Sequence, residues 1–302
     1  MKLIEFSFII ATINRVILCK RALDSIYTQS ILTPFEVIVV DQSIDDKTKL
    51  LCQNYNNLIF IQNPEKGLSL SRNLGIKKAS GRILIFVDDD GFLDPSYLKN
   101  LSRLLRKYPN CKGFAGIIYN IEDKKTFSRY HTKNNTSLTL LNYDKFLSSN
   151  IVLKKEIFNE IGMFDIDFGV GRKWGGSEDT DILIRGLLHK ADLLYSSEII
   201  VYHPKCNFSS FSFQQIFNKM YSYGLGRGAL YKKYARILPH WAIIQLLLSF
   251  LKASLGLAIS LIFFNRKGAI KNLGAIAGRA RGFLTYSGAD KSTFFSQKDN
   301  FL

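Results

Sequence analysis

The chain has few cysteines, and none is placed as a zinc site or a disulfide framework requires. The four residues, Cys19, Cys52, Cys111 and Cys206, lack the paired short spacings of a zinc site and the density of a disulfide-stapled domain. The sequence therefore favours a reducing, cytosolic setting. The opening residues, MKLIEFSFIIATINR, also lack the long apolar run and small-residue cleavage site of a signal peptide. They predict a first buried strand.

Acidic residues are absent from one long part of the chain. No Asp or Glu occurs from Ile199 to Ala289. From residue 205 to the end, 14 Lys and Arg face only Asp290 and Asp299, so +12 of the formal charge of +16 lies in the last third. A segment of this charge attracts phosphates of nucleic acid, anionic lipid or nucleotide. The remaining composition, 47% hydrophobic and 22% charged, excludes a disordered or fibrous chain.

Strand and helix patterns alternate through the first hundred residues and predict a layered α/β sheet. The predicted strands are Phe6–Ala11, Phe35–Val40, Leu58–Ile61, Arg82–Val87, Gly113–Tyr119 and Ile151–Leu153. The predicted helices are Val16–Gln29, Lys47–Tyr55, Leu68–Ala79, Lys154–Ile161 and Glu178–His189, and the polar segment 130–142 predicts a loop. Ligands of such sheets bind beyond the carboxyl ends of the strands. Asn14, Asp41 and the run Asp88 to Asp90 follow strands in this way.

The last third contains two apolar segments. Trp241–Phe264 is long enough to cross a bilayer, with Lys252 as its only charge. A stripe at helical spacing runs along it: Gln245, Ser249, Lys252, Gly256 and Ser260. Two interpretations stay open, a helix lying in the membrane interface and a spanning helix that packs this stripe against a neighbour.

The second apolar segment, Ala269–Leu284, carries Gly274, Gly278 and Gly282 four residues apart, beside basic residues. This pattern predicts a close-packing face on a helix at an anionic leaflet. The alternative for both segments is that they are core helices of a soluble domain.

Three adjacent carboxylates, Asp88 to Asp90, repel one another unless a cation compensates them. On an extended backbone Asp88 and Asp90 point to a common side. Hard oxygen ligands suit Mg²⁺ or Mn²⁺. The alternative is a turn whose acid caps the following helix, but Asp94, directly before Pro95, is the better N-cap candidate.

A second acidic group lies in WGGSEDTDILIRG. Gly175 and Gly176 predict a flexible loop and Ser177 a helix N-cap, with Glu178 and Asp179 in the first turn. Acids in a first turn often serve only the helix dipole. Near a bound diphosphate, however, such a carboxylate can act as a general base toward a hydroxyl group.

Six segments in order resemble the family 2 inverting glycosyltransferases with the GT-A fold. They are SFIIATINR, VIVVDQSIDD, KGLSLSRNLGI, ILIFVDDDGFLDP, SSNIVLKKEIFNEIGMFD and GGSEDTDILIRG, and the resemblance as a whole covers about residues 4–204. The resemblance implies a Rossmann-like mixed α/β sheet flanked by helices, a nucleotide-diphosphate sugar donor, with a UDP-sugar favoured, and a divalent cation, Mn²⁺ or Mg²⁺. It also implies inversion at the anomeric carbon by direct displacement, in a hexosyltransferase-type enzyme.

The resemblance assigns roles by position. Asp41 matches the acid that contacts the base, although Gln42 follows it where the family often has Asp-Gly. Asp90 matches the metal ligand of the Asp-any-Asp pair, with Asp88 nearer the ribose. The expected residues are, for the donor, Asp41, Arg72, Asn73, Asp88 and Asp89; for the metal, Asp88, Asp90 and His203; and for catalysis, Asp179 with Glu178 as its rival. His203 has a structural role as its alternative. Trp174 is a candidate platform for the acceptor sugar or a core residue.

The resemblance and the basic tail together predict two regions. Residues 1–204 form the catalytic domain, and residues 205–302 form a helical region that associates with an anionic membrane surface. YSYGLGRGALYKKY, before the apolar tail, resembles a segment of membrane-bound members. We therefore expect a saccharide or lipid-linked acceptor of cell-surface polysaccharide synthesis at the cytoplasmic face of the membrane. The alternatives are a non-catalytic partner subunit that binds nucleotide sugar and a nucleic-acid-binding protein. Nucleic acid is not expected as a partner, because no recognised nucleic-acid motif is present.

Overall fold

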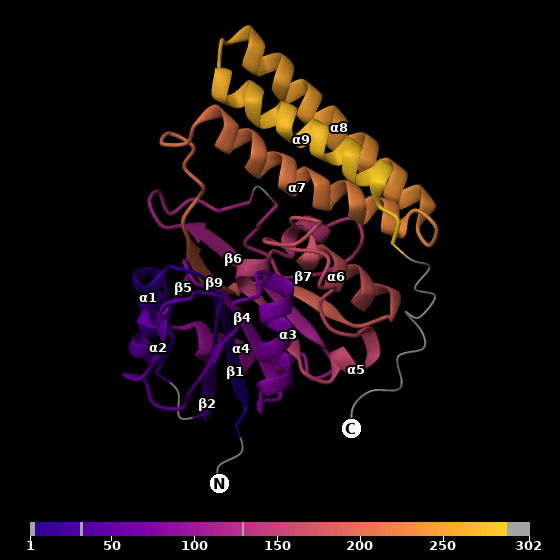
Figure 1. The fold of residues 1–302 in the computed structure, drawn as a ribbon. Coiled ribbons are helices and arrows are strands. Elements are labelled where there is room, and N and C mark those ends of the chain that lie inside the picture. Colours follow the sequence, from indigo (N-terminus) through magenta and orange to yellow (C-terminus); the bar gives the residue numbers. More distant parts are fainter. Residues whose placement is uncertain (1–3, 31–32, 129, 289–302) are drawn as a thin grey trace. The chain divides into compact units, whose positions relative to one another are not determined.

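The computed structural model describes residues 4–30, 33–128 and 130–288 (Figure 1). The contacts within the chain define two compact units. The first unit consists of the chain up to Phe164 together with Ile182–Lys205, and the second consists of Asp165–Asp181 and the chain from Cys206 onward.

A mixed sheet forms the first unit, in the order β3-β2-β1-β4-β8-β6-β9-β5, with β7 paired to β9. Strands β1 to β4 pair in parallel, β8 runs antiparallel to β4 and β6, and β6 and β9 are parallel. The strands are β1 (Phe6–Thr12), β2 (Phe35–Asp41), β3 (Leu58–Gln62), β4 (Ile83–Asp88), β5 (Phe92–Leu93), β6 (Gly113–Asn120), β7 (Thr136–Ser137), β8 (Ile151–Lys154) and β9 (Leu193–His203). The predicted mixed α/β sheet is confirmed.

Helices cover both faces of this sheet. They are α1 (Val16–Tyr27), α2 (Lys47–Cys52), α3 (Leu68–Lys78), α4 (Tyr97–Lys107), α5 (Ile157–Ile161) and α6 (Glu178–Leu188), with 3₁₀ turns at Tyr143–Lys145 and Ser148–Asn150. Phe8 of β1 belongs to a buried cluster with Leu23 of α1 and Leu101 of α4. Its neighbour Ile9 faces α3, where a Cβ on Gly75 would lie 2.5 Å from Ile9 Cγ2. Because both faces are covered, the central strands are continuous apolar runs rather than alternating ones.

The predicted elements are present with shifted ends. All five predicted helices are one to three residues too long at one end, because helix ends fray into turns that have no periodic signal. The predicted cap of the helix after Pro95 is wrong. Helix α4 begins at Tyr97 with Ser96 as its N-cap residue. Asp94 instead closes the preceding turn, with Oδ1 accepting hydrogen bonds from Ser96 N at 2.9 Å and Ser96 Oγ at 2.6 Å.

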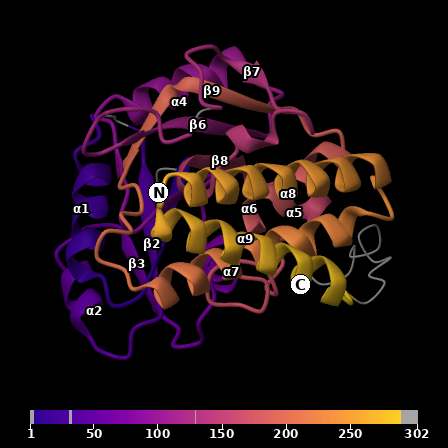
Figure 2. The same cartoon turned by 90° about the horizontal axis from the view of Figure 1, so that it is seen from above.

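Three long helices, α7 (Phe213–Tyr234), α8 (Pro239–Ile262) and α9 (Arg266–Thr285), make up most of the second unit and run side by side (Figure 2). Helix α7 starts with a capping box between Ser212 and Gln215. The glycine face predicted for α9 is confirmed, and its partner is α7. A Cβ on Gly282 would lie 2.1 Å from Leu225 O, and one on Gly228 of α7 would lie 2.1 Å from Arg279 O. The two backbones therefore touch directly.

Candidate active site

The carboxyl ends of three parallel strands bring polar residues to one edge of the first unit. Register pairs Thr12 of β1 with Asp41 of β2, and Ala11 of β1 with Asp88 of β4. The strand register places these ends at the same level, and most residues of β2 and β4 that lead to them are buried. This is the edge where open α/β sheets bind ligands.

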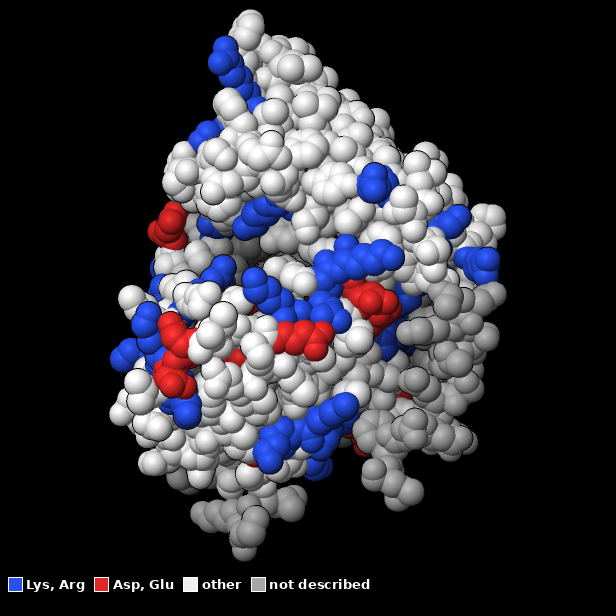
Figure 3. Space-filling view, in the orientation of Figure 1, with Lys and Arg blue, Asp and Glu red and all other residues white. Residues whose placement is uncertain are grey.

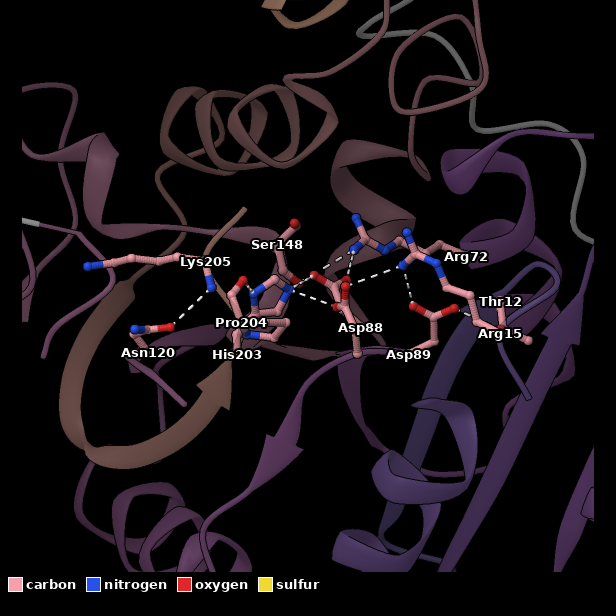
Figure 4. Close-up of polar contacts among 11 residues, drawn as sticks. Thr12, Arg15, Arg72, Asp88, Asp89, Asn120, Ser148, His203, Pro204 and Lys205 are labelled. Atoms are coloured by element: carbon pink, nitrogen blue, oxygen red, sulfur yellow. Dashed lines mark hydrogen bonds and ion pairs between the residues drawn. The ribbon is translucent and has the colours of Figure 1, made fainter. Parts of the chain in front are cut away.

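Asp88, Asp90 and His203 form a cluster at this edge, and one ligand atom from each lies within 4.8 Å of the others. His203 Nε2 lies 2.9 Å from Asp90 Oδ1 and 3.6 Å from Asp88 Oδ2. The other ring nitrogen, Nδ1, donates a hydrogen bond to Pro204 O at 2.8 Å, and this bond fixes the orientation of the imidazole (Figure 4). Strand β9 carries His203 to this position by pairing in parallel with β6, where His203 faces Asn120.

The charges of the cluster are strongly coupled. Burial opposes protonation of His203, but its hydrogen bonds to Asp88 and Asp90 and their charges raise its pKa to about 10. Burial alone would raise the pKa of Asp88, yet His203 and Arg72 hold it below its usual value. Two carboxylates and one imidazole within this distance fit Mn²⁺ or Mg²⁺ as ligands. The residues predicted for the metal are thus brought together.

The middle acid of the triplet, Asp89, faces a different set of partners. Thr12 Oγ1 donates to Asp89 Oδ2 at 2.8 Å, and Arg15 Nη1 lies 3.0 Å from Asp89 Oδ1 and 3.3 Å from Asp90 Oδ2. Burial, reinforced by Asp90, raises the pKa of Asp89 to about 6 against the opposing effects of Thr12 and Arg15. Sequence reasoning did not single out Thr12 and Arg15, although their place at and just beyond the carboxyl end of β1 was a sufficient signal.

Arg72 and Asn73 of α3 are both buried, and their surroundings differ. Arg72 Nη2 lies 3.1 Å from Asp88 Oδ1 (Figure 4). Its guanidinium lies over the rings of Phe86 and Phe164. Asn73 uses both ends of its amide on Phe164, donating to its carbonyl at 2.8 Å and accepting from its N–H at 3.0 Å. Arg72 therefore joins the acidic cluster, whereas Asn73 holds the segment that follows α5.

Asp41 is fully buried at the end of β2. Its Oδ1 accepts a hydrogen bond from Ser43 N at 3.0 Å. Its Oδ2 has no hydrogen-bond partner among the described residues. Gln42, where the sequence departs from the family pattern, accepts a hydrogen bond from Gly67 N at 2.6 Å and so ties β2 to the start of α3. Gly67 has φ 148°, a conformation that favours glycine.

The second acidic group belongs to the second unit. Ser177 precedes α6 with φ 72°, so the chain enters the helix through a left-handed turn. Glu178 is 5% exposed, while Asp179 is half-buried and accepts a hydrogen bond from Thr180 N at 2.6 Å. Of the two acids, Asp179 is the more accessible. Trp174 is buried, with its ring 5.3 Å from that of Tyr286.

Helix α7 supports the loop that carries these acids. A Cβ on Gly226 of α7 would lie 2.4 Å from Gly176 O, so the loop backbone rests directly on the helix. Lys233 Nζ lies 2.7 Å from Asp181 Oδ1, and Tyr234 Oη donates to the same oxygen at 2.9 Å. Sequence reasoning missed these contacts of Asp181, because the segment that ends in Lys233 and Tyr234, YSYGLGRGALYKKY, was interpreted only through its resemblance to a segment of membrane-bound members.

Comparison with known proteins gives a consistent result. The sequence model described as "Glycosyl transferase family 2" matches residues 7–169, which is more than half of the chain. The chain is 26% identical over 171 residues to the uncharacterized glycosyltransferase YwdF of Bacillus subtilis, a match covering 54% of this chain and 63% of that protein. It is 32% identical over 122 residues to the GalNAc(5)-diNAcBac-PP-undecaprenol beta-1,3-glucosyltransferase of Campylobacter jejuni, covering 38% of each.

Among solved structures, S. aureus TarS 1-349 in complex with UDP-GlcNAc matches with a TM-score of 0.58 at 17% identity, over 92% of each chain. This likeness shows the GT-A fold. The matches to the first three curated relatives span 12%, 63% and 13% of their lengths, less than two thirds in each case.

Proposed function

We propose that this chain, which belongs to glycosyl transferase family 2, transfers a sugar from a nucleotide-diphosphate donor to a hydroxyl group with inversion at the anomeric carbon. The observation that carries the proposal is the cluster of Asp88, Asp90 and His203 at the carboxyl edge of the sheet. A UDP-sugar is the favoured donor, because TarS, which shares the fold, is described in complex with UDP-GlcNAc.

The donor site combines a buried acid with a charged edge. Asp41 is assigned to contact the nucleobase of the donor, since its Oδ2 is buried and has no hydrogen-bond partner among the described residues. Asp88 and Asp89 are assigned to the ribose and diphosphate side, with Arg72 fixing Asp88. A divalent cation held by Asp88, Asp90 and His203 would supply positive charge to the departing diphosphate. Asn73 is also assigned to the donor site, by resemblance. Its observed role is to position Phe164 through a hydrogen bond to the carbonyl of that residue.

Asp179 is assigned as the general base that takes the proton of the acceptor hydroxyl. Its greater exposure relative to Glu178 supports this choice. A single base is enough for direct displacement, because no covalent intermediate has to be formed. We propose Trp174 as the residue on the acceptor side of the site. Its ring is buried and packs against the ring of Tyr286.

The proposed acceptor is a saccharide or lipid-linked saccharide of cell-surface polysaccharide synthesis, at the cytoplasmic face of the membrane. Two relatives are named for such acceptors: the Campylobacter enzyme for an undecaprenol-linked saccharide and TarS of Staphylococcus aureus for poly(ribitol-phosphate). We retain residues 1–204 as the catalytic region and residues 205–302 as the membrane-associated region.

Donor binding and turnover test the two acidic groups separately. Thermal-shift screening of UDP-sugars with Mn²⁺ identifies the donor, since a ligand that binds the folded state raises the unfolding temperature. Asp90→Ala is expected to abolish transfer with loss of metal-dependent donor binding. If Asp90→Ala binds the donor as tightly as the wild type does, both with and without Mn²⁺, the assignment of Asp90 as a metal ligand is contradicted.

Asp179→Asn is expected to abolish transfer while donor binding is kept, because only the proton acceptor is removed. Glu178→Gln is the matched comparison, and it should retain turnover. If Asp179→Asn turns over normally and Glu178→Gln does not, the base is Glu178. A wild-type protein that binds a UDP-sugar but transfers it to no acceptor would favour the non-catalytic partner subunit.

A further inference from the structure

Helix α8 presents an apolar face that the described protein leaves uncovered. Within this helix of 24 residues, a window of 18 residues has a mean hydropathy of 2.0, and only 17% of that window is buried. Its length and composition alone would allow it to cross a membrane, and its low burial argues against a core helix of a soluble domain. Large apolar side chains along it are 42–68% exposed: Ile243, Ile244, Leu247, Leu248, Leu251, Leu255, Ile259, Leu261 and Ile262.

The opposite face of α8 is covered by α9. Arg279 of α9 donates from Nη1 to Ser249 O at 3.2 Å. A Cβ on Gly256 would lie 2.8 Å from Asn272 Oδ1, and one on Gly268 would lie 2.6 Å from Ser260 Oγ. Ser249, Gly256 and Ser260 of the predicted stripe therefore lie at the contact with α9, whereas Lys252 is exposed.

Helix α9 cannot follow α8 into a bilayer. Its glycines lock it to the backbone of α7, and α7 in turn supports the loop at Gly176 through Gly226. If α8 crossed the hydrocarbon core of a bilayer, Arg279 would lie near the centre of that core, or α9 would have to separate from α8. A basic side chain at the centre of a bilayer is energetically costly. The packing thus opposes a spanning helix.

The charge of this region identifies the partner. The sequence from Ile199 to Ala289 contains no acid, and Figure 3 shows the surface over these helices as uncharged with isolated blue side chains. The exposed basic residues of α7, the turn after it and the two last helices are Lys232, Arg236, Lys252, Arg266, Lys271 and Arg281. An apolar strip with basic residues and no acids is the composition of a helix that binds an anionic lipid surface.

The turn between α8 and α9 continues the apolar surface. Phe263 is 75% exposed, and Phe264 is 90% exposed with φ 52°, a conformation unusual for an aromatic residue. Phe264, Leu261 and Phe213 border a cavity of about 350 Å³. Aromatic side chains beside Arg266 suit the boundary between lipid headgroups and acyl chains.

We propose that α8 lies in the plane of one leaflet of an anionic membrane, with its outer face in the acyl boundary and α9 behind it in the headgroup region. This deepens the proposed function, on which it rests, by deciding between the interfacial and spanning modes. Because α9 packs on α7 and α7 on the loop before Asp179, the membrane-bound face and the proposed catalytic base belong to one packed unit.

Vesicle flotation of the full-length protein tests the surface. Binding is expected to vesicles of phosphatidylglycerol mixed with phosphatidylcholine, with weaker binding in high salt and to phosphatidylcholine alone. The combined variant Leu247→Gln, Leu251→Gln, Leu255→Gln should bind about tenfold or more weakly, whereas the matched exposed change Leu141→Gln should bind like the wild type. The three leucines are 55–61% exposed, so their loss leaves the core intact.

The depth of labelled side chains in the bilayer distinguishes an in-plane helix from a spanning helix. In a Cys206→Ser background, a fluorophore is attached to cysteine introduced by Ile244→Cys, Leu251→Cys or Ile262→Cys and quenched by lipids brominated at known depths. An in-plane helix places all three probes at one shallow depth. A spanning helix of about 36 Å would place the middle probe deepest and the ends at opposite surfaces, and would overturn the proposal.

One further outcome also overturns it. Absence of vesicle binding by the wild type removes the lipid partner, and light scattering then shows whether a second copy of the chain covers the face instead. These measurements use no donor or acceptor. Their failure therefore leaves the glycosyl transfer assay untouched, and a failed transfer assay leaves the vesicle result standing.

Discussion

The ammonium group of Lys233 lies 2.7 Å from Asp181 Oδ1, and both side chains are buried, with 5% and 0% exposed. The same ammonium lies 2.8 Å from Asp165 Oδ2. Asp181 sits in the first turn of α6, two residues after the proposed base. One cation of α7 thus compensates two acids that flank the loop of the second unit.

Lys233→Met should therefore destabilise the protein by about 3–5 kcal/mol, because it leaves buried carboxylates without their cation. Urea unfolding followed by circular dichroism measures the loss. The control is Lys232→Met, since Lys232 is exposed and its removal should change stability by less than about 0.5 kcal/mol. Adding Asp181→Asn to Lys233→Met should recover part of the loss, and an additive double variant would show that the pair does not interact.

Gly282→Ala tests the direct backbone contact of α9 with α7. Helix propensity alone would make alanine more favourable than glycine by about 1 kcal/mol. The new Cβ, however, would lie 2.1 Å from the carbonyl oxygen of Leu225, which cannot move without shifting the helix. We expect a net loss of about 1–3 kcal/mol in unfolding free energy. Gly91→Ala is the control, because its Cβ would meet only ordinary contacts at 3.5 Å. A stabilised Gly282→Ala protein would contradict the packing.

His131 should make stability depend on pH. Burial lowers its pKa to about 4, and Nδ1 accepts a hydrogen bond from Ile118 N at 3.2 Å. The unfolded chain, with a pKa of about 6.5 for this group, binds a proton that the folded chain does not bind between these two values. Stability is therefore lost as pH falls through this window, by about 2 kcal/mol between pH ~7 and pH ~5.

Replacing His131 by asparagine, which keeps an acceptor for Ile118 N but cannot titrate, should flatten this dependence. Urea titrations of both proteins at the two pH values provide the comparison. An equal loss of stability in His131→Asn would assign the pH dependence to other groups.

His203→Gln should weaken Mn²⁺ binding in the presence of UDP. The imidazole Nε2 lies 2.9 Å from Asp90 Oδ1, and glutamine cannot place an equivalent nitrogen there with the ring fixed by Pro204. We expect a rise of about tenfold or more in the dissociation constant, since even residues that only orient ligands cost this much. Calorimetric titration measures it, with the exposed His240→Gln as control. Unchanged Mn²⁺ affinity in His203→Gln would remove His203 from the metal site.

Local pattern was enough to predict the sheet and its polar edge. Apart from Glu36, the runs that end at Asp41 and Asp88 are apolar because both faces of the sheet are covered, and such runs are visible in the sequence. The acidic triplet and the four-residue glycine spacing of α9 are also local, and the structure places each where the pattern indicates. The exact helix ends, by contrast, were not predicted, because turns such as the one closed by Asp94 depend on one or two side-chain hydrogen bonds.

The sequence by itself determined which residues carry charge and which segments are apolar, since composition and periodicity act over one or two turns of chain. Only the tertiary structure decided that Arg15 faces Asp89, that His203 meets Asp90, and that Lys233 holds Asp181. It also decided which face of α8 is covered by α9 and which is left exposed. These pairings join segments distant in sequence, and the path of the chain between them, rather than any local pattern, brings their side chains within a few ångströms.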